Sequence, residues 1–449
     1  MKKLMMLAVL AVLSFALVAC GGDDNGGGGT RNITLSYADW GDQELNQRLI
    51  DAFMEEYPHI DVVLRRDITG AGGQFTENLL NAQAAGVLPD VFAIDNVPVG
   101  LSNGLILDIT EFWDSDPDTQ YVYPNIQDTA VYNGRRFAMP SFQFINGVFV
   151  NITLLERYNI PIPDKDWTTD EFVALAEEVR RVGQNDMVYS IEPWFGDLNF
   201  TQIWPTLEDA DVGYNTWDGE QFNFTSPEWI RAYEVQLDLW SRGIPSSFSE
   251  AELAEIGEGW PWLLGYVAMN LDATWMLWMV EEMANNGFEV GFWPYPGGAA
   301  GQFPPTVLDY TVVSSQTQHP EEAYMLASWM SFGRQGWDVR MDVLEERLAA
   351  GELSVVDRFP VADYPEIWAR LDPFLDLVEG LRENVDLLEF SKPDVDKWLA
   401  GNNDFWEWTV NQEFPERIAE GLISPAEFAS EWETRINQFV REALDGLFD

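Results

Sequence analysis

The first part of the chain after position 30 predicts an α/β fold built on a parallel sheet. Apolar and polar side chains alternate in residues 33–40 and again in 59–66, which is the period of a strand with one buried face. Between these strands, apolar residues recur every four positions from Leu45 to Phe53, as in a helix. A glycine-rich turn, an apolar helix and a short buried strand within 86–95 follow. Strands that alternate with helices in this way form parallel sheets with helical crossovers.

Polar and aromatic side chains stand at the ends of two of these strands. Asp39 and Trp40 end the first strand, and Asp95 and Asn96 end the third. Ligands of open parallel sheets sit beyond the carboxyl ends of the strands, so we expect Trp40, Asp95 and Asn96 to line a ligand site. The alternative is a helix or turn cap for Asp95 and Asn96, and ordinary packing for Trp40.

The rest of the chain adds strands and helices in a less regular order. The clearest helix covers 168–181, where a threonine cap precedes an acidic first turn and arginines stand at the end. No internal repeat is present, and no apolar run after residue 20 is long enough to span a membrane. Further expected elements are a turn at 132–136, a strand with a proline break at 137–142, strands at 146–151, 290–298 and 311–317, and helices at 228–241 and 320–332.

The N-terminus predicts export and lipid anchoring. Lys2 and Lys3 precede an apolar run that ends in Leu17-Val18-Ala19-Cys20, and Cys20 is the only cysteine of the chain. The LVAC stretch resembles the bacterial lipobox, so we expect a signal peptide at 1–19, acylation of Cys20 and a flexible linker at 20–30. The protein would then be tethered to the cell membrane on its extracytoplasmic side. The alternative is an ordinary signal peptide with a chance cysteine.

The formal net charge of −50 excludes a general nucleic-acid-binding function, because a phosphate backbone would be repelled. A solvated acidic surface that keeps an exported protein soluble accounts for this charge. Adaptation to salty surroundings, where counterions screen the self-repulsion, accounts for it equally. Both interpretations make a strongly anionic ligand less favourable.

Several segments together resemble one protein family over nearly the whole mature chain. The chain resembles the extracellular solute-binding proteins of ABC sugar importers, in the group that contains maltose-binding protein. The sequence departs from the family pattern at Asp272-Ala273-Thr274, just before Trp275, so the local turn there can differ. The segments that carry the resemblance, in order, are FMEEYPHIDVVL, AAGVLPDVFAID, GLILDIT, YNGRRFAMPSF, VFVNITLLERYNIPIPDKDWTTDEFVALAEEV, AMNLDATW, SSQTQHPEEAYMLASWMSF and DRFPV.

The resemblance implies a two-lobe periplasmic-binding-protein fold. Each lobe would hold a mainly parallel sheet flanked by helices, and crossing segments would form a hinge near 141–146, 293–296 and 331–336. Lobe 1 would comprise 31–142 plus 297–332, and lobe 2 would comprise 143–296 plus 333–449. A monomeric receptor that hands a carbohydrate, such as an oligosaccharide, to the permease subunits of an ABC transporter is the function implied, and no cofactor is expected.

Sugars present hydroxyl edges and faintly apolar faces, so a sugar site needs flat aromatic platforms together with carboxylates or amides. The resemblance adds Glu192 and Trp194, Trp275 and Trp406 as family-matching positions. Asp272 precedes Trp275 after a strand, whereas Phe142 and Tyr295 fall in expected crossings. Core packing is the alternative for each aromatic residue, and hinge packing for Tyr295. The complete expected set is Trp40, Asp95, Asn96, Phe142, Glu192, Trp194, Trp204, Asp272, Trp275, Tyr295 and Trp406.

Two rival functions stay open. The same fold can bind a non-sugar solute, and paired carboxylates in a tryptophan-rich cleft can belong to a surface polysaccharide hydrolase. With 75 acidic residues, some carboxylate pair is always available, so that signal carries little weight. The chain has no nucleophile elbow, no HExxH and no phosphate loop, and we expect no catalytic and no metal-binding residues.

Overall fold

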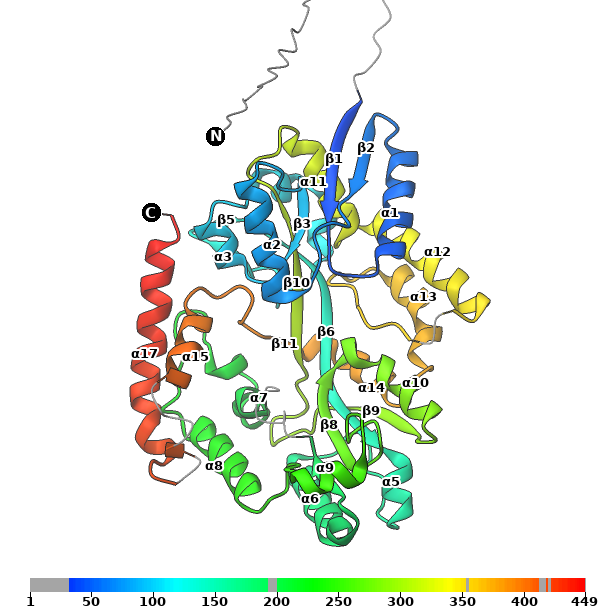
Figure 1. Ribbon diagram of the computed structural model, residues 1–449. Helices are drawn as coiled ribbons and strands as arrows, with labels where there is room; N and C mark the ends of the chain where they lie inside the picture. Colours follow the sequence, from blue (N-terminus) through cyan, green and yellow to red (C-terminus); the bar gives the residue numbers. More distant parts are fainter. Residues whose placement is uncertain (1–31, 193–199, 353–354, 412–416, 419–420, 449) are drawn as a thin grey trace, which may run out of the picture.

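The computed structural model describes residues 32–192, 200–352, 355–411, 417–418 and 421–448. The predicted signal peptide at 1–19, the predicted acylation site Cys20, the predicted linker at 20–30 and Trp194 lie outside the described residues. Two lobes stand one above the other in Figure 1, and two long strands run between them. We call these the upper and the lower lobe.

The upper lobe begins with the expected alternation of strands and helices, and this prediction is confirmed. β1 (Ile33–Ala38) pairs in parallel with both β2 (Ile60–Leu64) and β3 (Val91–Ile94), and α1 (Gln43–Glu56) and α2 (Gly72–Ala84) are the crossovers. Asp42 caps α1, because its side chain accepts hydrogen bonds from the backbone N–H groups of Glu44 and Leu45. β1 and β3 therefore end at the same edge of the sheet.

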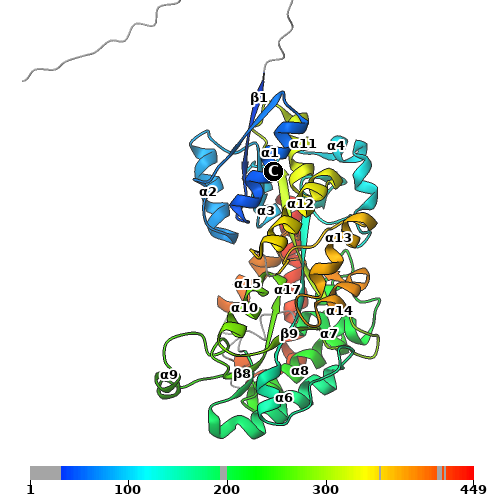
Figure 2. The ribbon, with the colours of Figure 1, turned by 90° about the vertical axis from the view of Figure 1, so that its right-hand side faces the viewer.

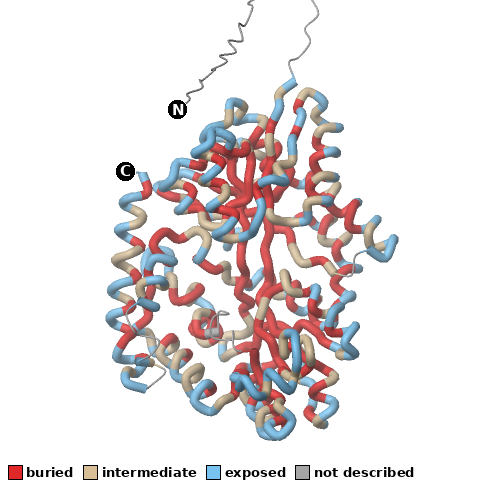
Figure 3. The backbone as a smooth tube through the Cα atoms, viewed as in Figure 1, coloured by how far each residue is buried: buried red, intermediate tan, exposed pale blue. Residues whose placement is uncertain are grey.

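Two long strands connect the lobes. β6 (Met139–Asn151) pairs antiparallel with β10 (Pro305–Val313), and every residue of both strands is buried, as the red central strands in Figure 3 show. The sequence predicted a strand with a proline break at 137–142 and another strand at 146–151, but β6 is one continuous strand. Pro140 stands near its start, where the register with β10 shifts between Asp309 and Tyr310, so the pairing adapts to the proline without ending the strand.

The lower lobe continues the same sheet. β7 (Tyr189–Ile191) runs parallel to β8 (Val267–Ala273), whereas β8 and β9 (Val290–Pro294) both pair antiparallel with β6. In the described part of the chain, nine strands form one mixed sheet with the path β2-β1-β3-β10-β6-β8-β7, to which β9 and β11 add at the side. The parallel strands expected from the sequence are thus joined to antiparallel ones where the chain crosses between lobes.

The helices expected from the sequence are present. α6 (Thr169–Gly183) has a full capping box, in which Thr168 and Glu171 each satisfy the backbone of the other. The other described elements are α3 (Val97–Ser102), α4 (Thr110–Ser115), η1 (Pro117–Tyr121), β4 (Val131–Tyr132), β5 (Arg135–Arg136), α5 (Ile152–Arg157), η2 (Gln184–Asp186), α7 (Phe200–Glu208), η4 (Tyr214–Thr216), α8 (Pro227–Ser241), α9 (Glu250–Ile256), η5 (Thr274–Met276), α10 (Trp278–Asn285), α11 (Pro320–Met330), α12 (Arg334–Ala350), α13 (Pro365–Leu375), α14 (Leu381–Asp386), η6 (Leu388–Phe390), β11 (Lys392–Pro393), α15 (Asn402–Asn411) and α17 (Pro425–Gly446).

The packing of two segments bears on where the lobes divide. Tyr295 and Phe303 pack in the apolar core of the lower lobe, so the chain enters the upper lobe through β10 itself. Trp337 and Met341 of α12 pack in the core of the upper lobe, although the sequence assigned 333–449 to lobe 2. The lobe boundaries stay a prediction, and this packing favours a later crossing than 331–336.

The helices surround the sheet on several sides, as the two perpendicular views show (Figures 1 and 2). The last helix, α17, runs along one side of the molecule: Phe428 and Trp432 pack in the lower core, and Leu447 reaches the upper core. In the part of the chain that the structure describes, no helix combines the length and apolar character needed to cross a membrane.

Candidate ligand-binding site between the lobes

The upper side of the candidate site is built around Lys397. Its ammonium lies 2.7 Å from Oδ1 of Asp309 on β10 and 3.7 Å from Oδ1 of Asp95 at the end of β3. The same nitrogen lies 5.9 Å from the ring centre of Trp40, which follows β1. Trp40 is half-buried, with the edge of its ring against Phe75. Trp40 and Asp95 therefore lie close to the same lysine at one edge of the sheet, and their contact with a ligand stays a prediction.

This corner of the site is strongly acidic. Burial raises the pKa of Asp394 well above its usual range. Burial alone would lower the pKa of Lys397, but the carboxylates of Asp309 and Asp95 hold it above its usual value. The positive charge of Lys397 thus offsets part of the free-energy cost of burying these carboxylates. Among the described residues, no three His, Cys, Asp or Glu side chains are arranged to hold a metal ion.

One face of β6 and β10, the two strands that cross between the lobes, forms the base of the candidate site. We call this face the floor. Phe142 and Phe144 point to the same side of β6, because side chains alternate along a strand. In register across from them on β10 stand Asp309 and Val307. Phe144 and Val307 form a small apolar cluster with Ala273, and Trp275 packs against it. The Lys397 corner and Trp275 therefore border the same face of the crossing strands.

The lower side of the site comes from the ends of β7 and β8. Glu192 follows β7 and accepts a hydrogen bond of 2.8 Å from the Trp260 indole nitrogen. Asp272, in β8, accepts a 2.8 Å hydrogen bond from the backbone of Ala273 and one from the Trp275 side chain. The Trp275 ring packs edge-on against Phe144 with its centre 5.4 Å away, and it stays partly exposed. Two carboxylates and two indoles thus gather at the ends of β7 and β8.

Both lower carboxyl groups are harder to ionise than usual. Burial raises the pKa of Asp272 to about 6, against the hydrogen bonds that lower it. Burial also raises the pKa of Glu192, and the nearby Asp272 charge adds to this effect. The causes of neither shift include a positively charged side chain.

We expect Asp272→Asn to change how stability depends on pH. The folded-state pKa of about 6 lies above the ordinary 3.8, so the folded protein holds the proton more tightly. Wild-type stability should therefore fall as pH rises from about 4 to 6, by up to about 3 kcal/mol from this group. The variant should lack this fall. Urea unfolding of both proteins at pH 4.5, 5.5, 6.5 and 7.5 measures it, and parallel curves would contradict the assignment.

Other predicted residues lie elsewhere. Asn96 caps α3 through a 3.0 Å hydrogen bond from the backbone of Val99, which is the alternative considered from the sequence. Trp204 and Tyr295 are 4% and 1% exposed in the lower core, so a ligand does not reach them in this conformation. Trp406 packs edge-on against Trp432 at 5.7 Å on the outer side of that core.

Phe142 is also buried, with its ring edge-on to Trp337 at a centre distance of 6.0 Å. Lys397, Asp309 and Trp260 are site residues that sequence reasoning missed. The one local signal was the rarity of lysine, since the chain has only five, and Lys397 stands among aspartates.

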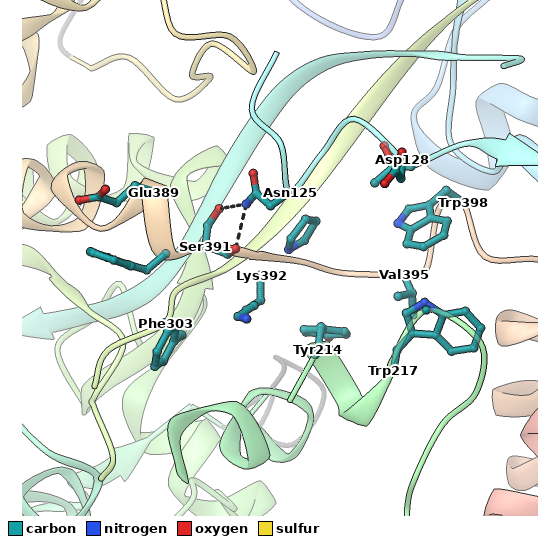
Figure 4. A pocket seen from close by; sticks show the side chains of 15 residues that line it. Asn125, Asp128, Tyr214, Trp217, Phe303, Glu389, Ser391, Lys392, Val395 and Trp398 are labelled. Atoms are coloured by element: carbon teal, nitrogen blue, oxygen red, sulfur yellow. Dashed lines mark hydrogen bonds between the residues drawn. The ribbon is translucent and has the colours of Figure 1, made fainter. Parts of the chain in front are cut away.

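Another cavity is lined by residues that the sequence did not predict. It has a volume of about 450 Å³ and is mainly apolar. Figure 4 shows Asn125 and Asp128 on one side of it, Tyr214 and Trp217 on the other, and Lys392 between them. Of the predicted site residues that the structure describes, none lines this cavity. Size alone therefore does not identify the site.

A two-lobed α/β sheet protein with polar and aromatic side chains between the lobes belongs to the class of solute-binding proteins. The sequence profile of the bacterial extracellular solute-binding protein family matches residues 39–332. The chain belongs to this family, whose members bind solutes. One curated relative is an ABC transporter extracellular-binding protein of Pyrococcus horikoshii, 25% identical over 277 residues. That match covers 58% of this chain and 60% of the relative's own length.

Solved structures of sugar-binding proteins have the same fold. An ABC substrate-binding protein of Listeria monocytogenes, in complex with cycloalternan, superposes with a TM-score of 0.66 at 19% identity, covering 91% of this chain and 98% of that one. The cyclic alpha-maltosyl-1,6-maltose binding protein of Arthrobacter globiformis gives 0.65 at 16% identity, covering 91% and 99%. The sugar-binding protein MalE of Xanthomonas citri gives 0.63 at 18% identity, covering 91% and 98%. At these identities the likeness establishes the fold alone.

Proposed function

We propose that this protein is the receptor of an ABC importer and captures a carbohydrate, such as an oligosaccharide, between its lobes. The observation that carries the proposal is the pairing of indoles and carboxylates on both sides of one floor. Trp40 and Asp95 stand on the upper side, and Trp275, Asp272 and Glu192 on the lower. Aromatic faces suit sugar C–H faces, and carboxylates accept hydrogen bonds from hydroxyls. The sugars in the solved relatives named above support the same class of ligand.

Capture follows from the division of the site between the lobes. Each lobe offers half of the contacts, so the ligand is bound fully only when both halves approach it. Closure is then a population shift driven by the higher affinity of the closed form, and the permease subunits recognise that form. In this proposal the chain breaks no bond of its ligand.

Export, anchoring and assembly complete the proposal. The N-terminal sequence supports a signal peptide and acylation of Cys20, which would hold the receptor on the extracytoplasmic face of the membrane. The receptor would act as a monomer. Mass spectrometry of the protein purified from membranes tests the anchor, because acylation adds the mass of the lipid to a chain that begins at Cys20.

The carbohydrate proposal is tested by titration of the chain from residue 31 onward with mono- and oligosaccharides. Tryptophan fluorescence and thermal shift should report saturable binding of at least one saccharide, and chromatography afterwards should recover it intact. Cleavage of the saccharide would favour the rival hydrolase. Binding of a non-sugar solute, with no response to any saccharide, would favour the same fold with a different cargo.

A further inference from the structure

Three arginines line a second cavity between the lobes. Trp275, the aromatic residue on which we propose that a sugar ring stacks and which we call the platform, borders the same cavity. This cavity of about 250 Å³ is bordered by Arg340, Arg347 and Arg358 together with Trp275 and Trp278. The whole chain has 25 Lys and Arg residues against 75 Asp and Glu. Three positively charged side chains at one small cavity are therefore unusual in a chain with three times as many acidic as basic residues.

Two structural elements bring the arginines together. Arg340 and Arg347 are seven positions apart on α12, so they lie on one face of the helix. Arg358 comes from the segment that follows. The guanidinium of Arg340 lies 4.7 Å from the ring centre of Phe142, and that of Arg358 lies 5.3 Å from the same ring and 5.7 Å from Phe144.

Phe144 connects Arg358 to Trp275. Phe144, which lies next to Arg358, is the ring against which Trp275 packs. A sugar ring on Trp275 would therefore place its substituents near these guanidinium groups.

Arg340 and Arg358 lack the partners that the other cations at this site have. Arg347 is paired with Asp42 at 2.7 Å. Within the described residues, neither Arg340 nor Arg358 has a carboxylate within 4.0 Å or a hydrogen-bond acceptor, yet the Arg340 residue is only 6% exposed.

The nearest carboxylates act only from a distance. Asp39 and Asp357 affect the arginines electrostatically, but Asp39 accepts its hydrogen bonds from the Tyr37 hydroxyl at 3.2 Å, from the Gly41 backbone and from the Asn46 side chain of α1 at 3.4 Å. Burial lowers the pKa of Arg340 to about 10, and the charge of Arg358 adds to that effect. Burial alone would lower the pKa of Arg358, but the charges of Asp39, Asp357 and Asp309 hold it above its usual value. Both guanidinium groups thus lie near the Phe142 ring at this cavity, with N–H donors that have no direct acceptor among the described residues and can bind an anion.

We propose that the carbohydrate bound by this receptor carries a carboxylate, as in a uronic-acid-containing oligosaccharide, and that Arg340 and Arg358 bind this group. The inference rests on the proposed function. A planar guanidinium fork matches a carboxylate in a bidentate arrangement. The net charge of −50 opposes anions at long range, but salt screens that repulsion beyond about 8 Å, whereas contact with buried donors is screened much less.

Matched saccharide pairs test the inference. The chain from residue 31 onward is titrated calorimetrically with cellobiose and cellobiouronic acid, with galactobiose and digalacturonic acid, and with inorganic phosphate, at pH 7 and 150 mM NaCl. We expect an acidic saccharide to bind at least tenfold more tightly than its neutral counterpart. Equal or tighter binding of the neutral member overturns the inference and leaves the proposed function standing. Failure of every saccharide overturns both, and phosphate that binds as tightly as the sugar acid overturns the carbohydrate class.

Variants assign the effect to the two arginines. Arg340→Gln and Arg358→Gln should each reduce the preference for the acidic saccharide at least tenfold while changing neutral binding less than threefold. Arg48→Gln is the matched control, because it removes the same charge from an exposed ion pair between Arg48 on α1 and Glu346 on α12. If Arg340→Gln does not fold, Arg358→Lys keeps the charge without the fork and should still lose part of the preference. An equal loss in Arg48→Gln would overturn the assignment.

Discussion

Trp275→Ala is expected to weaken saccharide binding by about 10- to 100-fold, which corresponds to roughly 1.4–2.7 kcal/mol. The indole is partly exposed and packs only against the small cluster of Phe144, Ala273 and Val307. Its removal therefore takes away a flat platform and the hydrogen bond to Asp272, but opens no large cavity in a main core. Titration of variant and wild type with the same saccharide measures the loss.

The control for this variant is Trp240→Ala. Trp240 is 38% exposed near the end of α8, and it contributes to neither side of the candidate site described above. We expect its replacement to leave the affinity unchanged within twofold. Thermal unfolding should show that both variants remain folded. An unchanged affinity in Trp275→Ala would return this residue to a structural role and would remove the main support for a sugar platform.

Lys397→Met is expected to destabilise the folded protein by about 3–5 kcal/mol, because it leaves buried carboxylates without their cation. Lys397 lies 2.7 Å from Asp309, whose side chain is 6% exposed, and 3.7 Å from Asp95. Methionine keeps the volume and apolar stem of the lysine but cannot neutralise these charges. Urea unfolding at pH 7 measures the change in the free energy of unfolding.

A second substitution and a change of pH show whether the lost charge or altered packing destabilises Lys397→Met. Lys397→Met with Asp309→Asn should recover much of the lost stability, since the closest uncompensated charge is then absent. The single variant should also regain stability as pH falls toward 5. Without the lysine, the buried negative charge has no compensating cation, so the loss of carboxylate charge at lower pH favours the folded form. A loss independent of pH and of Asp309 would indicate a packing defect.

Local patterns predicted most of the fold because they depend on neighbouring residues. The alternation in β1 and β2 and the four-residue period of α1 follow from which side chains must be buried. The capping box at Thr168 and Glu171 is likewise readable within four positions. Pro140 was misleading, because its effect on β6 depends on the register with β10, a strand that lies far along the chain.

The candidate site was predicted in part, for the same reason. Trp40, Asp95 and Trp275 follow strands, and the ends of strands in such a sheet can be anticipated from sequence. Tyr295 has similar flanking residues but points into the lower core. An aromatic residue in a proline-rich crossing has the same local pattern whether it faces a ligand or a core.

The sequence alone determined the α/β class, the order of the first strands and helices, the caps and the family, because periodicity and short motifs are local properties. Only the tertiary structure decided which charges meet. Lys397 and Asp309 are 88 positions apart, and Arg340 and Arg358 meet Phe142 across almost half the chain. These contacts depend on how β6 and β10 cross between the lobes and on what packs beside them, and that arrangement is set by long-range burial.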